Sequence, residues 1–180
     1  MSASKITRSK TVPKSFRIDE SALQAVEKEA IAQQVSSNTL VNQILIQFSE
    51  FDRFAKRINT VKPSGFVFRG ILEAADVDKV IEVAKTAGSS IPQALVSAKS
   101  GRVNIETLLD HLRVLSLYAR LYEYSENLDH QERVATLVHE FGLKWSIFLV
   151  HYITAMFEQV GLSPKLEMSD RSVILTLSSK

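Results

Sequence analysis

The first sixty residues show two hydrophobic periodicities in succession. In residues 12–18, apolar side chains fall on even positions, and the odd positions carry small, polar or cationic residues. Odd and even side chains point to opposite faces of a strand. We therefore predict a β-strand here, with an apolar face and a cationic face. A lone strand is not stable, and no neighbouring run of the chain supplies a partner.

Two amphipathic helices are predicted after this strand. Asp19 is a good N-cap, and the next apolar residues recur with helical spacing until about Gln33–Gln34. Ser36 is the best candidate for a second N-cap, and the helix that follows is expected to continue toward Ile58. The apolar stripe of the first helix is Leu23, Val26, Ala30 and Ile31, and that of the second is Leu40, Val41, Ile44, Leu45, Phe48 and Phe51.

A break at Pro63 and Gly65 ends the helical pattern, and we predict a linker at residues 61–65. Beyond it, residues 66–70 read as a short strand. A helix is then expected to stop at Gly88, and a second, short one to begin near Pro92 and end at Gly101. Asn104 is the predicted cap of a helix over residues 105–119.

Two hairpins and one long helix complete the chain. Alternating residues at 121–125 and 133–138 predict a hairpin with its loop around Asp129. The long helix is expected at 143–160, between Gly142 and Gly161, and the second hairpin turns at Ser169–Asp170. Residues 66–180 are therefore predicted to form an α+β domain with about five short antiparallel strands and four helices.

Composition narrows the possible classes of protein. The 180 residues are 45% hydrophobic, which is enough for a core. The absence of cysteine excludes disulfides, thiolate metal sites and cysteine nucleophiles, and it fits a cytoplasmic location. No signal peptide is visible. The longest apolar stretch, residues 145–157, is too short to span a bilayer, so no membrane association is expected.

The charge is unevenly distributed along the chain. Residues 1–65 hold ten Lys/Arg and six Asp/Glu, a net charge of +4, whereas residues 66–180 hold twelve and fourteen, a net charge of −2. A basic N-terminal module on a mildly acidic body predicts that the N-terminal end binds a polyanion. Residues 1–10 are expected to be a basic, disordered arm.

Candidates for chemistry are few. The four histidines show no H-x-H or H-x3-H pair, so structural or surface roles are expected and no metal is predicted. The acidic pairs of the first hairpin lack a nucleophile or a phosphate-binding loop, so neither an enzyme nor a cofactor is predicted. One face of the long helix carries Trp145, Phe148, Tyr152 and Met156. Such a stripe is typical of a core, with a ligand pocket as the alternative.

The order strand, helix, turn, helix over residues 11–58 resembles the ribbon–helix–helix superfamily of DNA-binding proteins, the MetJ/Arc/CopG type. Residues 13–48 fit its pattern without a gap. In this family two chains pair their strands into an antiparallel ribbon that enters the major groove. The resemblance implies an intertwined homodimer in which a second copy supplies the missing strand. The family's buried positions fall on Phe16, Ile18, Leu23, Val26, Leu40, Ile44 and Phe48, and its caps on Asp19 and Ser36.

The resemblance also implies the residues that contact DNA. The family's three outward strand positions face base edges, and they fall on Pro13, Ser15 and Arg17. Arginine suits guanine, whose O6 and N7 accept a bidentate fork. Phosphate contacts are implied for the start of the second helix and for two strand-side cations. These residues are Ser36, Ser37, Asn38, Lys10 and Lys14.

Two residues depart from the family pattern. Pro13 has no N–H, so it fits a ribbon only at a non-hydrogen-bonded pair, and its base contact is limited to apolar atoms. The turn between the helices often carries glycine in this family, whereas this chain has Gln34. A left-handed glutamine costs about 1–2 kcal/mol, which favours a different turn.

We therefore expect an α+β protein with a ribbon–helix–helix domain at residues 11–60 and a regulatory or oligomerisation domain at 66–180. The expected function is sequence-specific binding of double-stranded DNA by a homodimeric, cytoplasmic, nucleoid-associated transcriptional regulator, with an effector or protein partner at the second domain. Three alternatives stay open: an antitoxin or plasmid partition or mobilisation factor, a dimerisation module that binds only protein, and a three-element start to a larger fold. The segment from His139 to Gly161 is also similar to uncharacterised archaeal proteins, which implies no activity.

Overall fold

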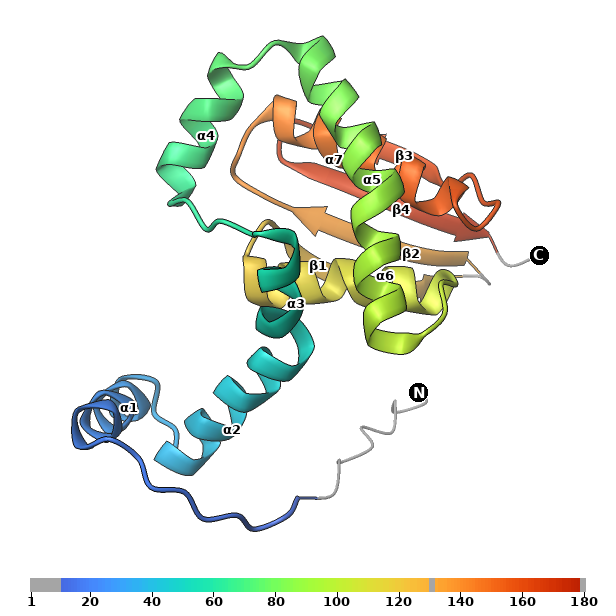
Figure 1. The fold of residues 1–180 in the computed structure, drawn as a ribbon. Helices are drawn as coiled ribbons and strands as arrows, with labels where there is room; N and C mark the ends of the chain where they lie inside the picture. The colour runs from blue at the N-terminus through green and yellow to red at the C-terminus, as the bar shows by residue number, and fades with distance from the viewer. Residues whose placement is uncertain (1–10, 130–131, 179–180) are drawn as a thin grey trace. The chain divides into compact units, whose positions relative to one another are not determined.

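The computed structural model describes residues 11–129 and 132–178, and the chain divides into two compact units, Met1–Leu45 and Ile46–Lys180 (Figure 1). The predicted arm at residues 1–10, with its Lys10, lies outside the described residues. The division falls before the predicted linker at 61–65. The prediction of a domain over residues 11–60 concerns a dimer, so packing within one chain does not decide it.

Residues 11–19 form no strand within the single chain. Every strand of the described residues belongs to the C-terminal half, so one chain alone does not contain the N-terminal ribbon. The physical reason is that a strand needs a neighbour to hydrogen-bond its backbone. The chain is α+β, as predicted, but its sheet is C-terminal.

Helix α1 spans Glu20–Ala32 and begins as predicted at Asp19, whose carboxylate accepts a hydrogen bond from the Ser21 N–H at 3.0 Å. It ends in a left-handed residue, Gln34, with φ of 56°. Val35 N donates to Ala30 O and Gln34 N donates to Ile31 O, which is the hydrogen-bond pattern of a Schellman motif. The expectation of a different turn is therefore wrong, because these two bonds stabilise the left-handed glutamine.

The second helical run continues to Ile58 as predicted, but not as one regular helix. Helix α2 spans Ser37–Gln47, and the Ser36 hydroxyl caps it by accepting from the Thr39 N–H at 3.0 Å. A π-helical turn, η1, covers Phe48–Asp52 and is followed by α3 (Arg53–Ala55) and the 3-10 turn η2 (Lys56–Ile58). Asn59, with φ of 51°, ends the run.

Two predictions between residues 65 and 100 are wrong. Residues 66–70 belong to helix α4 (Gly65–Ala74), which Ser64 caps, because a short apolar run does not distinguish a strand from a helix. Helix α5 (Val77–Ser100) runs through both Gly88 and Pro92, where two helices were expected. Gly88 does not end the helix, because it is the point at which another helix passes close by: a Cβ there would lie 2.3 Å from Tyr152 O.

The remaining elements agree with the predicted order. Helix α6 spans Ile105–Val114 with a capping box between Asn104 and Thr107, and the π-helical turn η3 (Leu115–Ala119) extends it. Helix α7 spans Leu143–Glu158. The predicted hairpins are confirmed, although residues 130–131 of the first loop lie outside the described residues. Their strands are β1 (Glu123–Asp129), β2 (Glu132–Val138), β3 (Lys165–Met168) and β4 (Ser172–Ser178).

The four strands form one antiparallel sheet in the order β1-β2-β4-β3. Helix α7 packs against α5 and also against β3 and β4, so it is buried on most of its surface (Figure 1). Leu137 and Leu175 of the sheet and Ile153 and Phe157 of α7 are fully buried in the resulting core. No helix of the described residues has the length and hydropathy needed to cross a membrane.

Candidate functional site

The residues predicted to contact DNA bases lie on the surface of the first unit. Pro13, Ser15 and Arg17 are exposed, as is Lys14, and Lys10 lies outside the described residues. Within the described chain neither Lys14 nor Arg17 makes an ion pair or a side-chain hydrogen bond, so both cations are available to an external anion. Their contact with DNA stays a prediction.

The predicted phosphate-binding residues gather at the start of α2. The Ser36 hydroxyl is engaged as the cap and also lies 2.8 Å from Thr39 Oγ1. The backbone N–H groups of Ser37 and Asn38 precede the first full turn and have no intrahelical acceptor. They are therefore free to donate to a phosphate oxygen, as the N-termini of helices do.

Few apolar side chains of the first unit are covered within one chain. Among residues 11–45, Ala30 and Leu40 are the only hydrophobic side chains that are buried. Three positions that the resemblance places in a dimer core are open to solvent: Phe16 is 66% exposed, Ile18 49% and Ile44 49%. The apolar stripes predicted from periodicity exist, and several of their members stay exposed in the single chain, namely Leu23, Ile31, Ile44, Leu45 and Phe48.

The second unit contains a cavity of about 1060 Å³, bordered by the η1–α3 segment, α4, α5, α6, η3 and α7. Nine of the fourteen aromatic residues of the chain line it, so it holds most of the chain's aromatic side chains. Of the predicted stripe on α7, Trp145, Phe148 and Tyr152 face this cavity, while Met156 is fully buried in the core. The core interpretation therefore holds for Trp145, Tyr152 and Met156, and a ligand in the cavity stays a prediction.

The aromatic wall is ordered by ring contacts and hydrogen bonds. The rings of Trp145 and Phe148 are stacked, with centroids 4.6 Å apart and an interplanar angle of 11°. Phe148 in turn stacks on Tyr152 at 5.7 Å. The Trp145 indole N–H donates to Leu121 O at 3.1 Å, which fixes the ring against the wall.

A buried polar pair lies at the cavity wall. His111 Nε2 and the Tyr152 hydroxyl are 2.8 Å apart and share a hydrogen bond. Burial lowers the pKa of His111 to about 4, so the imidazole is neutral at physiological pH, and burial raises the pKa of Tyr152. His111 Nδ1 has no hydrogen-bond partner among the described residues.

All but one of the charged residues that line the cavity form an ion pair or a hydrogen bond within the described chain. Lys99 pairs with Asp110 at 2.8 Å, and Glu50 accepts from the Tyr118 hydroxyl at 3.3 Å. Lys62 lies 3.5 Å from Asp52. Arg120 lines the same cavity and makes no ion pair or side-chain hydrogen bond within the described chain. Its φ of 55° places it in the left-handed region.

Other histidines and carboxylates are dispersed. His139 is buried and bonds Ser146 Oγ at 2.9 Å, and burial lowers its pKa. His130 lies outside the described residues. Glu126 pairs with Arg133 at 2.7 Å on the surface of the first hairpin. The described residues contain no group of three side chains with metal-ligating chemistry.

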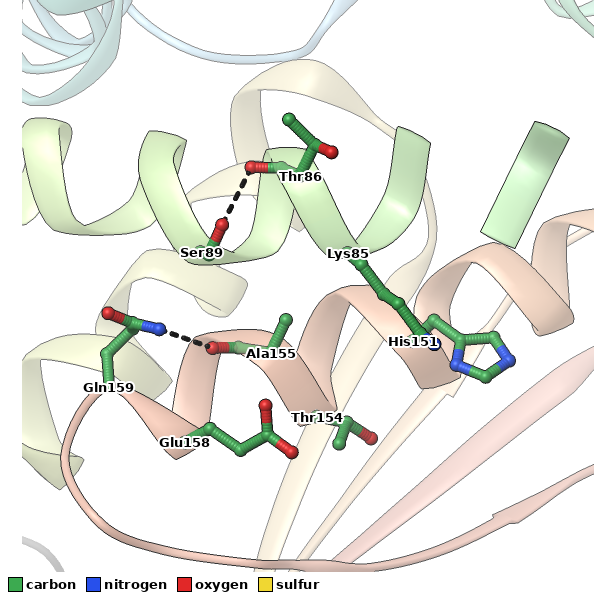
Figure 2. A pocket seen from close by; sticks show the side chains of 8 residues that line it. All are labelled: Lys85, Thr86, Ser89, His151, Thr154, Ala155, Glu158 and Gln159. Atoms are coloured by element: carbon green, nitrogen blue, oxygen red, sulfur yellow. Dashed lines mark hydrogen bonds between the residues drawn. The ribbon is translucent and has the colours of Figure 1, made fainter. Parts of the chain in front are cut away.

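A second, smaller pocket of about 430 Å³ lies along α5 and α7, and Figure 2 shows its eight lining residues. Its ionisable members are Lys85, His151 and Glu158, which make no ion pair or hydrogen bond with one another. The two dashed bonds in Figure 2 join side chains to backbone carbonyls of their own helices, namely Ser89 to Thr86 and Gln159 to Ala155. This pocket is a polar groove beside the close helix crossing and holds no catalytic arrangement.

Comparison of the chain with protein-family models, with curated proteins and with solved structures finds no match.

Sequence reasoning missed Arg120 and the polar role of His111. His111 shares a helical face with Leu108 and Leu112, a signal of burial that gives no indication of Tyr152 as its partner. Arg120 follows a helix end like many surface arginines, and no local pattern distinguishes it. Both depend on segments that are distant in sequence.

Proposed function

We propose that this protein is a homodimeric, sequence-specific double-stranded DNA-binding protein that acts as a transcriptional regulator. Residues 12–18 of two copies pair into an antiparallel ribbon, and the ribbon enters the major groove. The observation that carries this proposal is the exposure of the apolar strand and helix residues of the first unit in a single chain.

The first unit, Met1–Leu45, is only slightly longer than the smallest domains that fold alone, and two of its described hydrophobic side chains are buried, which favours a partner. Domains below about 40 residues usually require a disulfide, a metal or oligomerisation, and the chain has no cysteine. Fully burying a side chain such as Phe16 or Ile18 contributes about 1.5–3 kcal/mol. In a two-fold dimer each such gain occurs twice, which favours self-association.

The geometry of a ribbon suits this sequence. If Ser15 pairs with its own copy across the two-fold axis, Pro13 of one chain lies opposite Arg17 of the other. Pair types alternate along an antiparallel ladder, so Pro13 and Ser15 both occupy non-hydrogen-bonded pairs. The missing N–H of Pro13 then costs no ladder hydrogen bond.

The turn between the helices supports the same fold. Gln34 adopts the left-handed conformation that this family often fills with glycine. Both predicted caps, Asp19 and Ser36, are also in place. The free N–H groups at the start of α2 and the unpaired Lys14 and Arg17 then supply phosphate and base contacts.

Gel shifts over a range of salt concentrations test the DNA contacts. Arg17→Ala should lower discrimination between the preferred and a scrambled duplex by about 1–3 kcal/mol while leaving the helical content unchanged. Lys10→Ala should weaken binding to both duplexes and flatten the dependence on salt. Lys28→Ala, an exposed cation of α1 outside the proposed interface, is the control and should change neither.

Sedimentation equilibrium of the same variants separates the alternatives. A dimer that shows no salt-sensitive binding to any duplex would favour a module that binds only protein. A protein that remains monomeric at micromolar concentration would overturn the proposal altogether. Phe16→Ala should raise the dimer dissociation constant strongly, because the truncation removes apolar surface from both halves of the core.

A further inference from the structure

We propose that the cavity of the second unit is a binding site for a small molecule that combines an aromatic ring system with an anionic group. Arg120 would hold the anion, and His111 would hydrogen-bond a polar atom of the ring portion. This inference concerns residues 46–178 and does not depend on DNA binding by the first unit.

The size and lining of the cavity favour an aromatic ligand. Ligand sites typically enclose about 300–1,000 Å³ and are mostly apolar with a few polar groups. At about 1060 Å³ this cavity lies just above that range. Trp145, Phe148 and Tyr152 line it as a stack of rings, and aromatic rings favour offset or edge-to-face packing with a further ring.

His111 supplies a polar anchor inside this apolar wall. The residue is only 6% exposed, yet it lines the cavity and its Nδ1 has no hydrogen-bond partner. No buried side-chain nitrogen or oxygen of the described residues lacks a partner, so the unpartnered Nδ1 keeps some accessible surface and can bond a ligand in the cavity. The neutral imidazole can donate or accept at Nδ1, depending on which way the hydrogen bond with Tyr152 runs.

Arg120 gives the site its preference for an anion. The two carboxylates of the wall, Glu50 and Asp110, are already engaged by Tyr118 and Lys99. Arg120 is the charged residue of the wall that has no partner within the described chain. A guanidinium binds a carboxylate or sulfonate through charge-assisted hydrogen bonds, which are about twice as strong as neutral ones.

Two fluorescent dyes that share the same ring system test the proposal on the full chain. 1-Anilinonaphthalene-8-sulfonate carries an anionic sulfonate, and N-phenyl-1-naphthylamine is its neutral counterpart. We expect both to bind with a stoichiometry of one per chain. Arg120→Gln should weaken the anionic dye about tenfold, as the loss of a charged hydrogen bond predicts, and change the neutral dye by less than about twofold.

Matched variants show whether the dyes occupy this cavity. Ala87→Phe fills the cavity from α5 and should weaken both dyes, whereas Ala94→Phe adds the same ring at an exposed position of the same helix and should weaken neither. Arg171→Gln removes an exposed arginine that does not line the cavity and should leave both affinities unchanged.

Several results would overturn the inference. One is a wild-type chain that binds neither dye at that stoichiometry. Another is an Arg120→Gln variant that weakens the anionic dye no more than Arg171→Gln does, or that weakens both dyes to the same extent. Equal binding by Ala87→Phe and Ala94→Phe would show that the dyes lie on other apolar surface. Because Arg120 is exposed and unpaired, its variant should fold normally. The ratio of the two dye affinities therefore tests the inference even where a filling variant is unstable.

Discussion

Gly88 in the middle of α5 allows the two central helices to approach each other, and Gly88→Ala tests this directly. A Cβ at this position would lie 2.3 Å from Tyr152 O and 3.0 Å from both Tyr152 C and Tyr152 Cα. The contacted atoms are backbone, so no side-chain rotation relieves the clash. The helices would have to separate by about 0.7 Å to bring the shortest contact to 3.0 Å.

The net effect is a difference between two opposing contributions. Alanine is favoured over glycine in a helix by about 1 kcal/mol. Overpacking a core costs about 1–3 kcal/mol, and a clash with backbone belongs at the upper end of that range. We therefore expect Gly88→Ala to lower the free energy of unfolding by about 2 kcal/mol.

Gly70→Ala is the matched control, because it makes the same substitution inside helix α4. A Cβ at Gly70 meets no atom within 4 Å, so only the helix preference remains. This variant should be more stable than wild type by about 0.5–1 kcal/mol. Urea titrations followed by the fluorescence of Trp145, the sole tryptophan, report on the second unit at a fixed protein concentration. Equal stabilisation by both substitutions would refute the close helix crossing.

Three further predictions concern the second unit. Burial lowers the pKa of His111 from 6.5 to about 4, so between these pH values the unfolded chain binds a proton that the folded chain excludes. The free energy of unfolding should therefore fall by about 3 kcal/mol as the pH drops from about 6.5 to about 4. Urea titrations of His111→Gln should lack this part of the pH dependence. Asn104→Ala removes the capping box of α6 and should lower the free energy of unfolding by about 1 kcal/mol. Asn127→Ala, at an exposed position of β1, is the control and should leave the free energy of unfolding unchanged. Lys144 donates to the Glu73 and Ala75 carbonyls near the end of α4, so Lys144→Met should raise hydrogen exchange in α4, whereas Lys79→Met should not.

Local signals in the sequence were sufficient for most element boundaries. The caps at Asp19, Ser36 and Asn104 and the stop at Gly101 each act through hydrogen bonds or backbone angles of nearby residues, so the sequence alone predicted them. The two hairpins were equally predictable from period-two alternation.

The errors occurred where distant segments decide the structure. Gly88 looks like a helix stop, but Tyr152 explains why glycine is needed there inside a continuous helix. Residues 66–70 are too short an apolar run to distinguish a strand from a helix. Local sequence patterns do not predict the cavity, because His111, Arg120 and Trp145 come together only through the packing of three separate segments. The strand proposed over residues 12–18 is absent from the single chain and would need a second chain to form.

Oxidative cross-linking of Ser15→Cys tests the proposed ribbon most directly. The chain has no native cysteine, so this variant carries a single thiol. Opposite residues of a non-hydrogen-bonded pair have Cα atoms about 4.5 Å apart, a separation that a disulfide can span. The proposed dimer predicts rapid, nearly complete formation of a disulfide-linked dimer. If Ser15→Cys cross-links no faster than Ser163→Cys, an exposed position of the second unit, the two strands do not pair and the proposal fails.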